Sequence, residues 1–172
     1  IGNGCADAGV DYARHVPVVI TAQLLGLPES DADRFRDWIH DIIERGQGEP
    51  EVGIQATREV LGYFREQLAY RRDHPGDDLT TLLTNAQIDG EPLAERTQAA
   101  MLLLLLIGGI DTTWTALGSS LWHLATHPED QTRLRQEAEL LDTALEEFLR
   151  FYAPVEIGRI VTHDAELGGC PV

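Results

Sequence analysis

Apolar residues recur at helical spacing along the first half of the chain. One group follows intervals of three and four residues and consists of Phe35, Trp38, Ile39, Ile42 and Ile43. A second stripe consists of Val60, Leu61, Phe64 and Leu68. Such periodicity is that of one buried helix face, so it predicts amphipathic helices over residues 31–44 and 52–72. An earlier apolar segment, residues 17–25, starts at a proline and stops at Gly26, which predicts a further short helix.

The second half of the chain begins with a much longer helical pattern. Between Pro92 and Pro128 there is no strong helix breaker except glycine, so we expect one helix to fill most of this stretch. Its middle is apolar on most sides, which is typical of a helix that runs through the centre of a protein larger than this chain. The apolar run 99–110 is shorter than the roughly 20 residues that span a bilayer, so no membrane segment is expected.

Shorter elements are indicated by caps and turn residues. Asp77 or Asp78 is expected to cap a short helix through Leu83, and Asp142 a helix that ends before Ala153. A further helix should begin at Pro128, which is followed by the acids Glu129 and Asp130 in the first turn. Residues 159–172 are rich in β-branched residues and turn residues, which predicts a small hairpin interrupted in mid-strand. The chain is therefore expected to be mainly α and to form a single partial domain over residues 1–172.

Charge and cysteine content narrow the function. The net charge is −16, with 29 acidic residues against 13 basic ones, which argues against nucleic acid or an anionic membrane surface as a partner. Cys5 and Cys170 lie at opposite ends without metal-ligand spacing, which suits a reducing, cytoplasmic compartment. Because the first residue, Ile1, is not methionine, we expect the natural N-terminus to lie upstream.

The segment 102–113, LLLLLIGGIDTT, breaks the local rules for a buried helix. Each of Gly108 and Gly109 costs about 1 kcal/mol relative to alanine, and the Asp111 carboxylate is costly to bury. The glycines leave room for a ligand to approach the backbone, and the Thr112 hydroxyl can bond the Gly108 carbonyl and locally open the helix. Asp111 could then pass protons toward the threonine. The alternative is a close helix crossing with satisfied polar groups.

A second motif lies in the helix expected near residues 143–152. Glu147 and Arg150 are one turn apart, so they can form an ion pair. The alternative is an ordinary solvated pair worth a few tenths of a kcal/mol, for which Glu146 could compete. The spacing alone is common in helices.

Taken together, the motifs resemble those of the cytochrome P450 superfamily, above all its soluble bacterial, camphor-hydroxylase-like members. GGIDTT resembles the oxygen-binding groove of the family's long central helix, and Glu147-Phe-Leu-Arg150 resembles its ExxR motif. The further similar segments are VPVVITAQLLGLPESD, RRDHPGDDLTTLL and GRIVTHDAELGG. The resemblance implies the middle portion of a P450 fold, with a long central helix and a small β hairpin at the C-terminal end. The N-terminal helices and the haem-cysteine loop would lie outside this chain.

The resemblance also implies an activity for the full-length protein. It would be a haem-thiolate monooxygenase that activates dioxygen and hydroxylates an apolar small molecule, using haem b and electrons from a ferredoxin or flavoprotein. The fragment alone would be inactive.

Roles for individual residues follow from the same resemblance. Asp111 and Thr112 would deliver protons during dioxygen cleavage, and Glu147 and Arg150 would be structural. The residues implied to contact the haem are Gly108, Gly109 and, through a propionate, Arg159. The positions implied to face substrate are Leu104, Ile107, Val155 and Ile157. No metal ligand is expected, because neither Cys5 nor Cys170 lies in the Phe-Gly-x-Gly context of the family's axial cysteine.

Two rival interpretations remain. The chain could belong to a P450-like auxiliary protein without haem that stabilises or activates a partner enzyme, such as a glycosyltransferase. It could also be a helical packing module with chance motifs. The acid-alcohol pair and the ExxR motif favour the enzyme, because a haem-free helper has no need to deliver protons.

Overall fold

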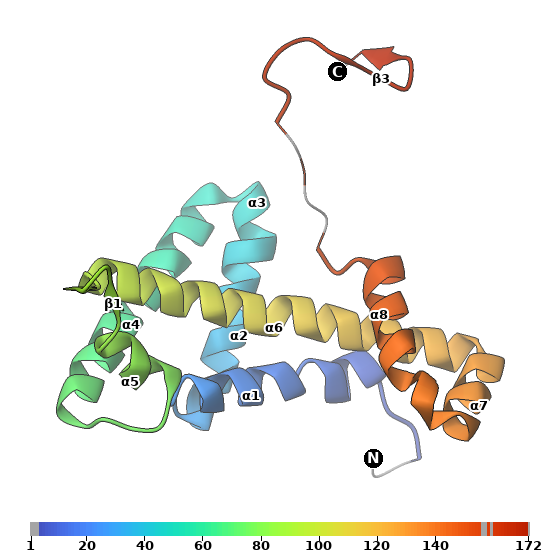
Figure 1. Ribbon diagram of the computed structural model, residues 1–172, viewed down its shortest axis with the longest axis horizontal. Helices are drawn as coiled ribbons and strands as arrows, with labels where there is room; N and C mark the ends of the chain where they lie inside the picture. The colour runs from blue at the N-terminus through green and yellow to red at the C-terminus, as the bar shows by residue number, and fades with distance from the viewer. Residues whose placement is uncertain (1–3, 156–157, 159, 172) are drawn as a thin grey trace.

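The computed structural model describes residues 4–155, 158 and 160–171. Its longest element is α6 (Glu95–Thr126), along which the other helices are arranged (Figure 1). The helices before it are α1 (Val16–Leu24), α2 (Ala32–His40), α3 (Gly46–Gly48), α4 (Pro50–Asp73) and α5 (Leu79–Thr84). Those after it are α7 (Pro128–Gln136) and α8 (Leu141–Tyr152), which lie near its C-terminal end. The expected mainly α fold with a long central helix is confirmed.

Short irregular helices and two small hairpins complete the described part of the chain. The π-helices are η1 (Ala8–Ala13) and η3 (Asp41–Arg45), and the 3-10 helices are η2 (Glu29–Asp31) and η4 (Ala138–Leu140). One antiparallel pair joins β1 (Gln87–Ile88) to β2 (Glu91–Pro92). The other joins β3 (Glu166–Leu167) to β4 (Cys170–Pro171).

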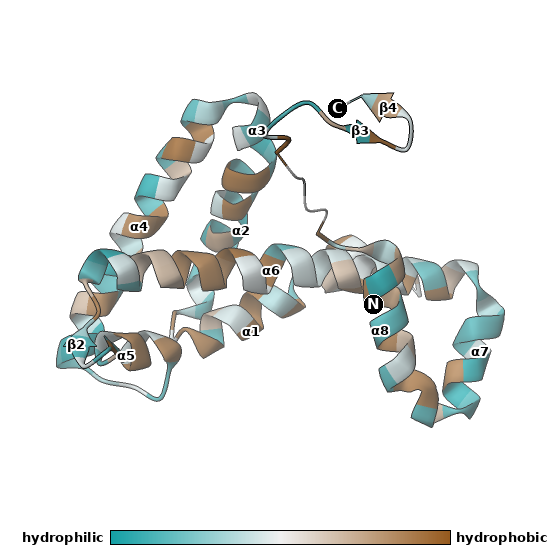
Figure 2. Ribbon diagram, turned by 45° about the horizontal axis from the view of Figure 1, so that its top comes forward, coloured by the Kyte–Doolittle hydropathy of each residue, from teal (hydrophilic) through white to brown (hydrophobic). Residues whose placement is uncertain are grey.

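One hydrophobic core joins α1, α2, α4 and α6. Phe35 and Ile39 of α2 and Val60, Phe64 and Leu68 of α4 are fully buried, as the helical periodicity predicts. The fully buried apolar residues of α6 recur at intervals of three and four, so only one stripe of this helix is covered; they are Ala99, Leu102, Leu106 and Ile110. Figure 2 shows apolar residues on other faces of α6 too, and Leu104 is 70% exposed.

An ion pair with little exposure fixes the end of α1 relative to α4 and α5. The Arg71 guanidinium lies 3.0 Å from the Asp78 carboxylate and donates to the Gly26 carbonyl at 2.6 Å. Gly26 has φ of 67°, a left-handed conformation that favours glycine. Asp78 also accepts from the Thr81 amide and caps α5, which confirms one of the two expected caps. The arginine therefore links three helices that flank α6.

Several local expectations are wrong. Asp142 does not cap α8, because the 3-10 turn η4 leads directly into this helix and places Leu140 at the cap position. The helix expected over residues 31–44 changes to a π-helix at Asp41. The expected C-terminal hairpin, by contrast, is confirmed, because β3 pairs with β4 around a turn at Gly168 and Gly169, which have φ of 58° and 83°.

By length and composition, α6 meets the criterion for a helix that can cross a membrane. The apolar character of this helix extends beyond residues 99–110, the run from which no membrane segment was expected. Length and composition do not separate a membrane span from the core helix of a soluble protein.

Candidate functional site

The acid-alcohol step lies in the middle of α6. The Thr112 hydroxyl donates to the Gly108 carbonyl oxygen at 2.8 Å, as the four-residue spacing predicts. The predicted local opening of the helix is wrong, because α6 remains α-helical from Glu95 to Thr126. A threonine hydroxyl can share a carbonyl one turn earlier without displacing the backbone donor, so the bond and the intact helix are compatible.

The two glycines of the motif face different surroundings. A Cβ atom at Gly108 would find no other group within 4 Å, so this position leaves the backbone of α6 open. A Cβ atom at Gly109 would lie 2.7 Å from Oγ1 of Thr21, a buried side chain of α1. Gly109 therefore permits the close crossing of α1 and α6, the alternative interpretation of the motif, whereas Gly108 leaves space for a ligand.

This difference predicts opposite effects of alanine at the two positions. Gly109→Ala should lower the free energy of unfolding by about 1–3 kcal/mol, because the added methyl group forces α1 and α6 apart. Gly108→Ala is the matched control and should raise stability by up to about 1 kcal/mol, because alanine favours an unobstructed helix. Urea unfolding of both variants measures the difference. Equal stability of the two proteins would contradict the assignment.

Asp111 is half-buried beside Thr112. Burial raises the pKa of its carboxyl, and the negative charge of Glu44 raises this pKa further. A carboxyl with a raised pKa holds a proton at higher pH than an ordinary aspartate does, which suits a group that passes protons. Because its pKa is higher in the folded state, the contribution of Asp111 favours folding at low pH and is lost as pH rises through the folded pKa.

Removing the charge of Glu44 should therefore bring the pKa of Asp111 closer to its ordinary value. The Glu44→Gln variant tests this link, with the carboxyl carbon shift of Asp111 followed by NMR during a pH titration. Glu51→Gln removes an exposed acid from the first turn of α4 and serves as the control. We expect a lower pKa of Asp111 in the first variant only. An unchanged pKa in Glu44→Gln would contradict the electrostatic link.

The predicted substrate-facing residues are only partly brought together. Leu104 lies one turn before Gly108 on α6, so the two share a face, and Ile107 is half-buried beside them. Val155 follows α8 and is 53% exposed. Ile157 and Arg159 lie outside the described residues. The open face of α6 around Gly108 thus carries Leu104 and Thr112.

Glu147 and Arg150 form the predicted ion pair on α8. The arginine donates through Nε to one carboxylate oxygen and through a terminal nitrogen to the other, both at 2.7 Å. This bidentate geometry is the strong form of the interaction, and the hydrogen bonds from Arg150 lower the pKa of Glu147. Both side chains are more than half exposed. Glu147, not the competing Glu146, is the partner.

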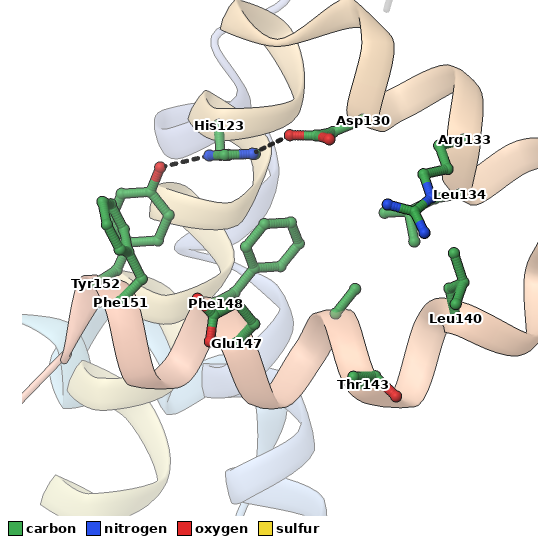
Figure 3. Close-up of a pocket in the computed structure, with 11 residues that line it drawn as sticks. His123, Asp130, Arg133, Leu134, Leu140, Thr143, Glu147, Phe148, Phe151 and Tyr152 are labelled. Carbon is green, nitrogen blue, oxygen red and sulfur yellow. Dashed lines mark hydrogen bonds and ion pairs between the residues drawn. The ribbon is translucent and has the colours of Figure 1, made fainter.

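Glu147 also borders a cavity of about 460 Å³ between the C-terminal part of α6, α7 and α8 (Figure 3). Here the His123 ring lies between the Tyr152 hydroxyl and the Asp130 carboxylate. Sequence analysis missed this group. Its three members lie on three helices and form no local motif, and the step from His127 to Pro128 and Glu129 indicated only a helix start.

The comparisons identify the family. The model of the family described as Cytochrome P450 matches residues 33–172, so the chain belongs to the cytochrome P450 family. It is 34% identical over 150 residues to the polyketide biosynthesis cytochrome P450 PksS of Bacillus subtilis, covering 87% of this chain and 37% of that protein. This family match excludes the interpretation of the chain as a helical packing module whose motifs arose by chance.

Two other relatives are named for their activities. The vitamin D(3) 25-hydroxylase of Pseudonocardia autotrophica is 34% identical over 154 residues, covering 89% of this chain and 38% of that protein. The linalool 8-monooxygenase of Pseudomonas putida is 34% identical over 159 residues, covering 90% and 39%. The solved structure of PksS superposes with a TM-score of 0.85 at 32% identity, covering 97% of this chain and 44% of that one. The chain thus spans less than half the length of these relatives.

Proposed function

We propose that these residues supply the oxygen-activating side of a haem-thiolate monooxygenase that hydroxylates an apolar small molecule. The observation that carries the proposal is the Thr112 hydroxyl bonded to the Gly108 carbonyl on an open face of α6, next to a carboxyl of raised pKa. An auxiliary, haem-free protein finds no support among the relatives, which include a hydroxylase and a monooxygenase by name. We regard the chain as one part of a single domain.

The described residues fit a haem on this face. A flat group can approach the backbone at Gly108, where no Cβ and no neighbouring group intervene, and the exposed Leu104 offers an apolar contact. When bound, haem b supplies the binding of dioxygen and the electron chemistry. We propose that Arg159 pairs with a propionate. The axial cysteine is expected elsewhere, since Cys5 and Cys170 are exposed and lack the family's loop context.

The chain's own residues deliver the protons. In the described state the Thr112 hydroxyl donates to the Gly108 carbonyl, and its oxygen can still accept a hydrogen bond. The hydroxyl becomes a donor to a ligand when it rotates away from this carbonyl. Asp111 is adjacent, and its raised pKa allows it to carry the replacement proton. Because Gly109 has no Cβ, this part of α6 packs closely against Thr21 of α1.

The class of substrate is inferred from the same face of α6, and the electron donor from the family. The apolar side chains of Leu104, Ile107 and Val155 favour an apolar substrate, to which Ile157 would add a further contact. Relatives named for vitamin D(3) and linalool oxidation support this class, and a related structure holds a hexadec-9Z-enoic acid-ligated acyl carrier protein. A ferredoxin or flavoprotein would supply electrons, and we propose a cytoplasmic location.

Isotope labelling tests this function in the full-length protein. Apolar candidates that shift the haem absorption on binding are turned over with an electron donor under ¹⁸O-labelled dioxygen. A monooxygenase places one labelled atom in the product and takes none from labelled water. Label derived from water, or no oxygenated product from any candidate that binds, would contradict the proposal.

A further inference from the structure

His123 lies in the last turn of α6 and joins three helices through its two ring nitrogens (Figure 3). Its Nδ1 is 2.7 Å from the hydroxyl oxygen of Tyr152, the last residue of α8. Its Nε2 is 2.9 Å from a carboxylate oxygen of Asp130, in the first turn of α7. Only 18% of the His123 side chain is exposed, whereas 46% of the Asp130 side chain is, so water has less access to the imidazole than to the carboxylate.

Two further rings fix the faces of the imidazole. His127 stacks on it with 4.2 Å between ring centroids and 11° between planes. Phe148 of α8 lies at 5.0 Å with an interplanar angle of 57°. Phe148 follows Glu147 directly in the sequence, so the same helix turn carries both a ring contact to His123 and the ion pair. The imidazole is thus held at both nitrogens and on its faces.

The bonding partners determine the direction of the hydrogen bonds in the neutral ring. An ionised Asp130 can only accept, so Nε2 of His123 carries the proton and donates to it. Nδ1 then accepts from the Tyr152 hydroxyl. Both ring nitrogens of His123 thus have a complementary partner. An apolar residue at position 123 would remove both links together.

The attachment of α8 has a consequence for the proposed substrate pocket. Tyr152 ends α8, and the next residue, Ala153, has φ of 39°, which turns the chain toward Val155. The position of Val155 and of the Glu147–Arg150 pair therefore depends on where α8 sits on α6. The ion pair itself lies between side chains of α8 alone and cannot supply this attachment.

We infer that His123 is a positioning residue, which fixes α8 and thereby the Val155 side of the substrate pocket relative to the helix that carries Thr112. The inference rests on the proposed function, and adds to it a site on the far end of α6. His123 touches neither Thr112 nor Asp111 and takes no part in proton delivery. Loss of its bonds should affect substrate binding and leave the chemical step in place.

Single substitutions separate the two links. His123→Leu removes both, His123→Asn places an amide oxygen near the Nδ1 position, and His123→Gln places an amide nitrogen near the Nε2 position. Tyr152→Phe removes one link from the other side. His74→Leu is the matched control, because His74 stacks on Tyr70 in a different part of the chain.

The test measures KM, kcat per bound haem and the fraction of electrons lost to peroxide in the full-length protein. We expect His123→Leu and Tyr152→Phe to raise KM about tenfold, with kcat per haem and the peroxide fraction unchanged. His123→Asn keeps an acceptor near the Tyr152 hydroxyl and should therefore raise KM less than His123→Leu does. His74→Leu should have the KM of the wild type. A KM unchanged in His123→Leu would overturn the inference, as would a KM raised equally in His74→Leu.

A double-mutant cycle on thermal unfolding gives a readout that needs no turnover. If His123 and Tyr152 act through one bond, the effects of His123→Leu and Tyr152→Phe are less than additive, whereas additive effects would overturn the inference. If the wild-type protein bound no haem or showed no turnover, this result would contradict the proposed function instead. The cycle would then still decide whether the three helices are joined at His123.

Discussion

Replacing Thr112 by alanine is expected to leave haem binding and oxygen consumption in place but to divert most electrons to hydrogen peroxide. The change removes a methyl group and one polar group, the hydroxyl that bonds the Gly108 carbonyl. Without it, Asp111 has no relay beside it, so the proton needed for productive cleavage arrives too slowly. General acid catalysis of this kind contributes on the order of a hundredfold or more.

The ratio of hydroxylated product to electrons consumed measures this effect. We expect it to fall at least about tenfold in Thr112→Ala. Thr112→Ser keeps the hydroxyl and should retain much of the coupling. Thr113→Ala removes the neighbouring, exposed threonine and should behave as the wild type. Coupled product formation at the wild-type level in Thr112→Ala would disprove the role.

Glu147→Ala and Arg150→Ala are expected to abolish haem incorporation in the full-length protein. Both side chains are more than half exposed in the described structure, so an isolated pair of this kind would contribute less than about 1 kcal/mol. The family resemblance implies a structural role for the pair, and we propose that its bidentate hydrogen bonds hold the core near the haem. Loss of either partner leaves the other charge without its two hydrogen bonds.

Haem content per folded protein after size-exclusion chromatography measures this effect. The control is Glu137→Ala, which removes one member of the exposed pair between Arg133 of α7 and Glu137, the residue after this helix. We expect normal haem content in the control and little haem in the two α8 variants. Normal haem content in Glu147→Ala would show that Glu147 and Arg150 form only an ordinary surface ion pair.

Local periodicity predicted most helices and one bond of the site. The stripe of Phe64 and Leu68 on α4 is buried as expected, because a helix repeats its face every three to four residues. The Thr112–Gly108 bond could be predicted for the same reason, since both residues lie one turn apart on one helix. These features require no knowledge of how the helices cross.

Features that depend on helix crossing could not be predicted. The sequence does not show that Gly109 faces Thr21 while Gly108 faces open space, because neighbouring residues differ by about 100° around a helix. The group of His123, Asp130 and Tyr152 was missed for a related reason, since each member lies on a different helix. The prediction of a cap at Asp142 was wrong because a 3-10 turn leads directly into α8.

The absorption spectrum of the reduced full-length protein with carbon monoxide tests the central claim most directly. A haem held by a cysteine thiolate gives a ferrous carbonyl band shifted to longer wavelength than a histidine-ligated haem does. We expect this shifted band from the full-length protein, in which Gly108, Asp111 and Thr112 form the oxygen-activating face of α6. A purified, folded protein that binds no haem, or that gives only the band of histidine-ligated haem, would contradict it.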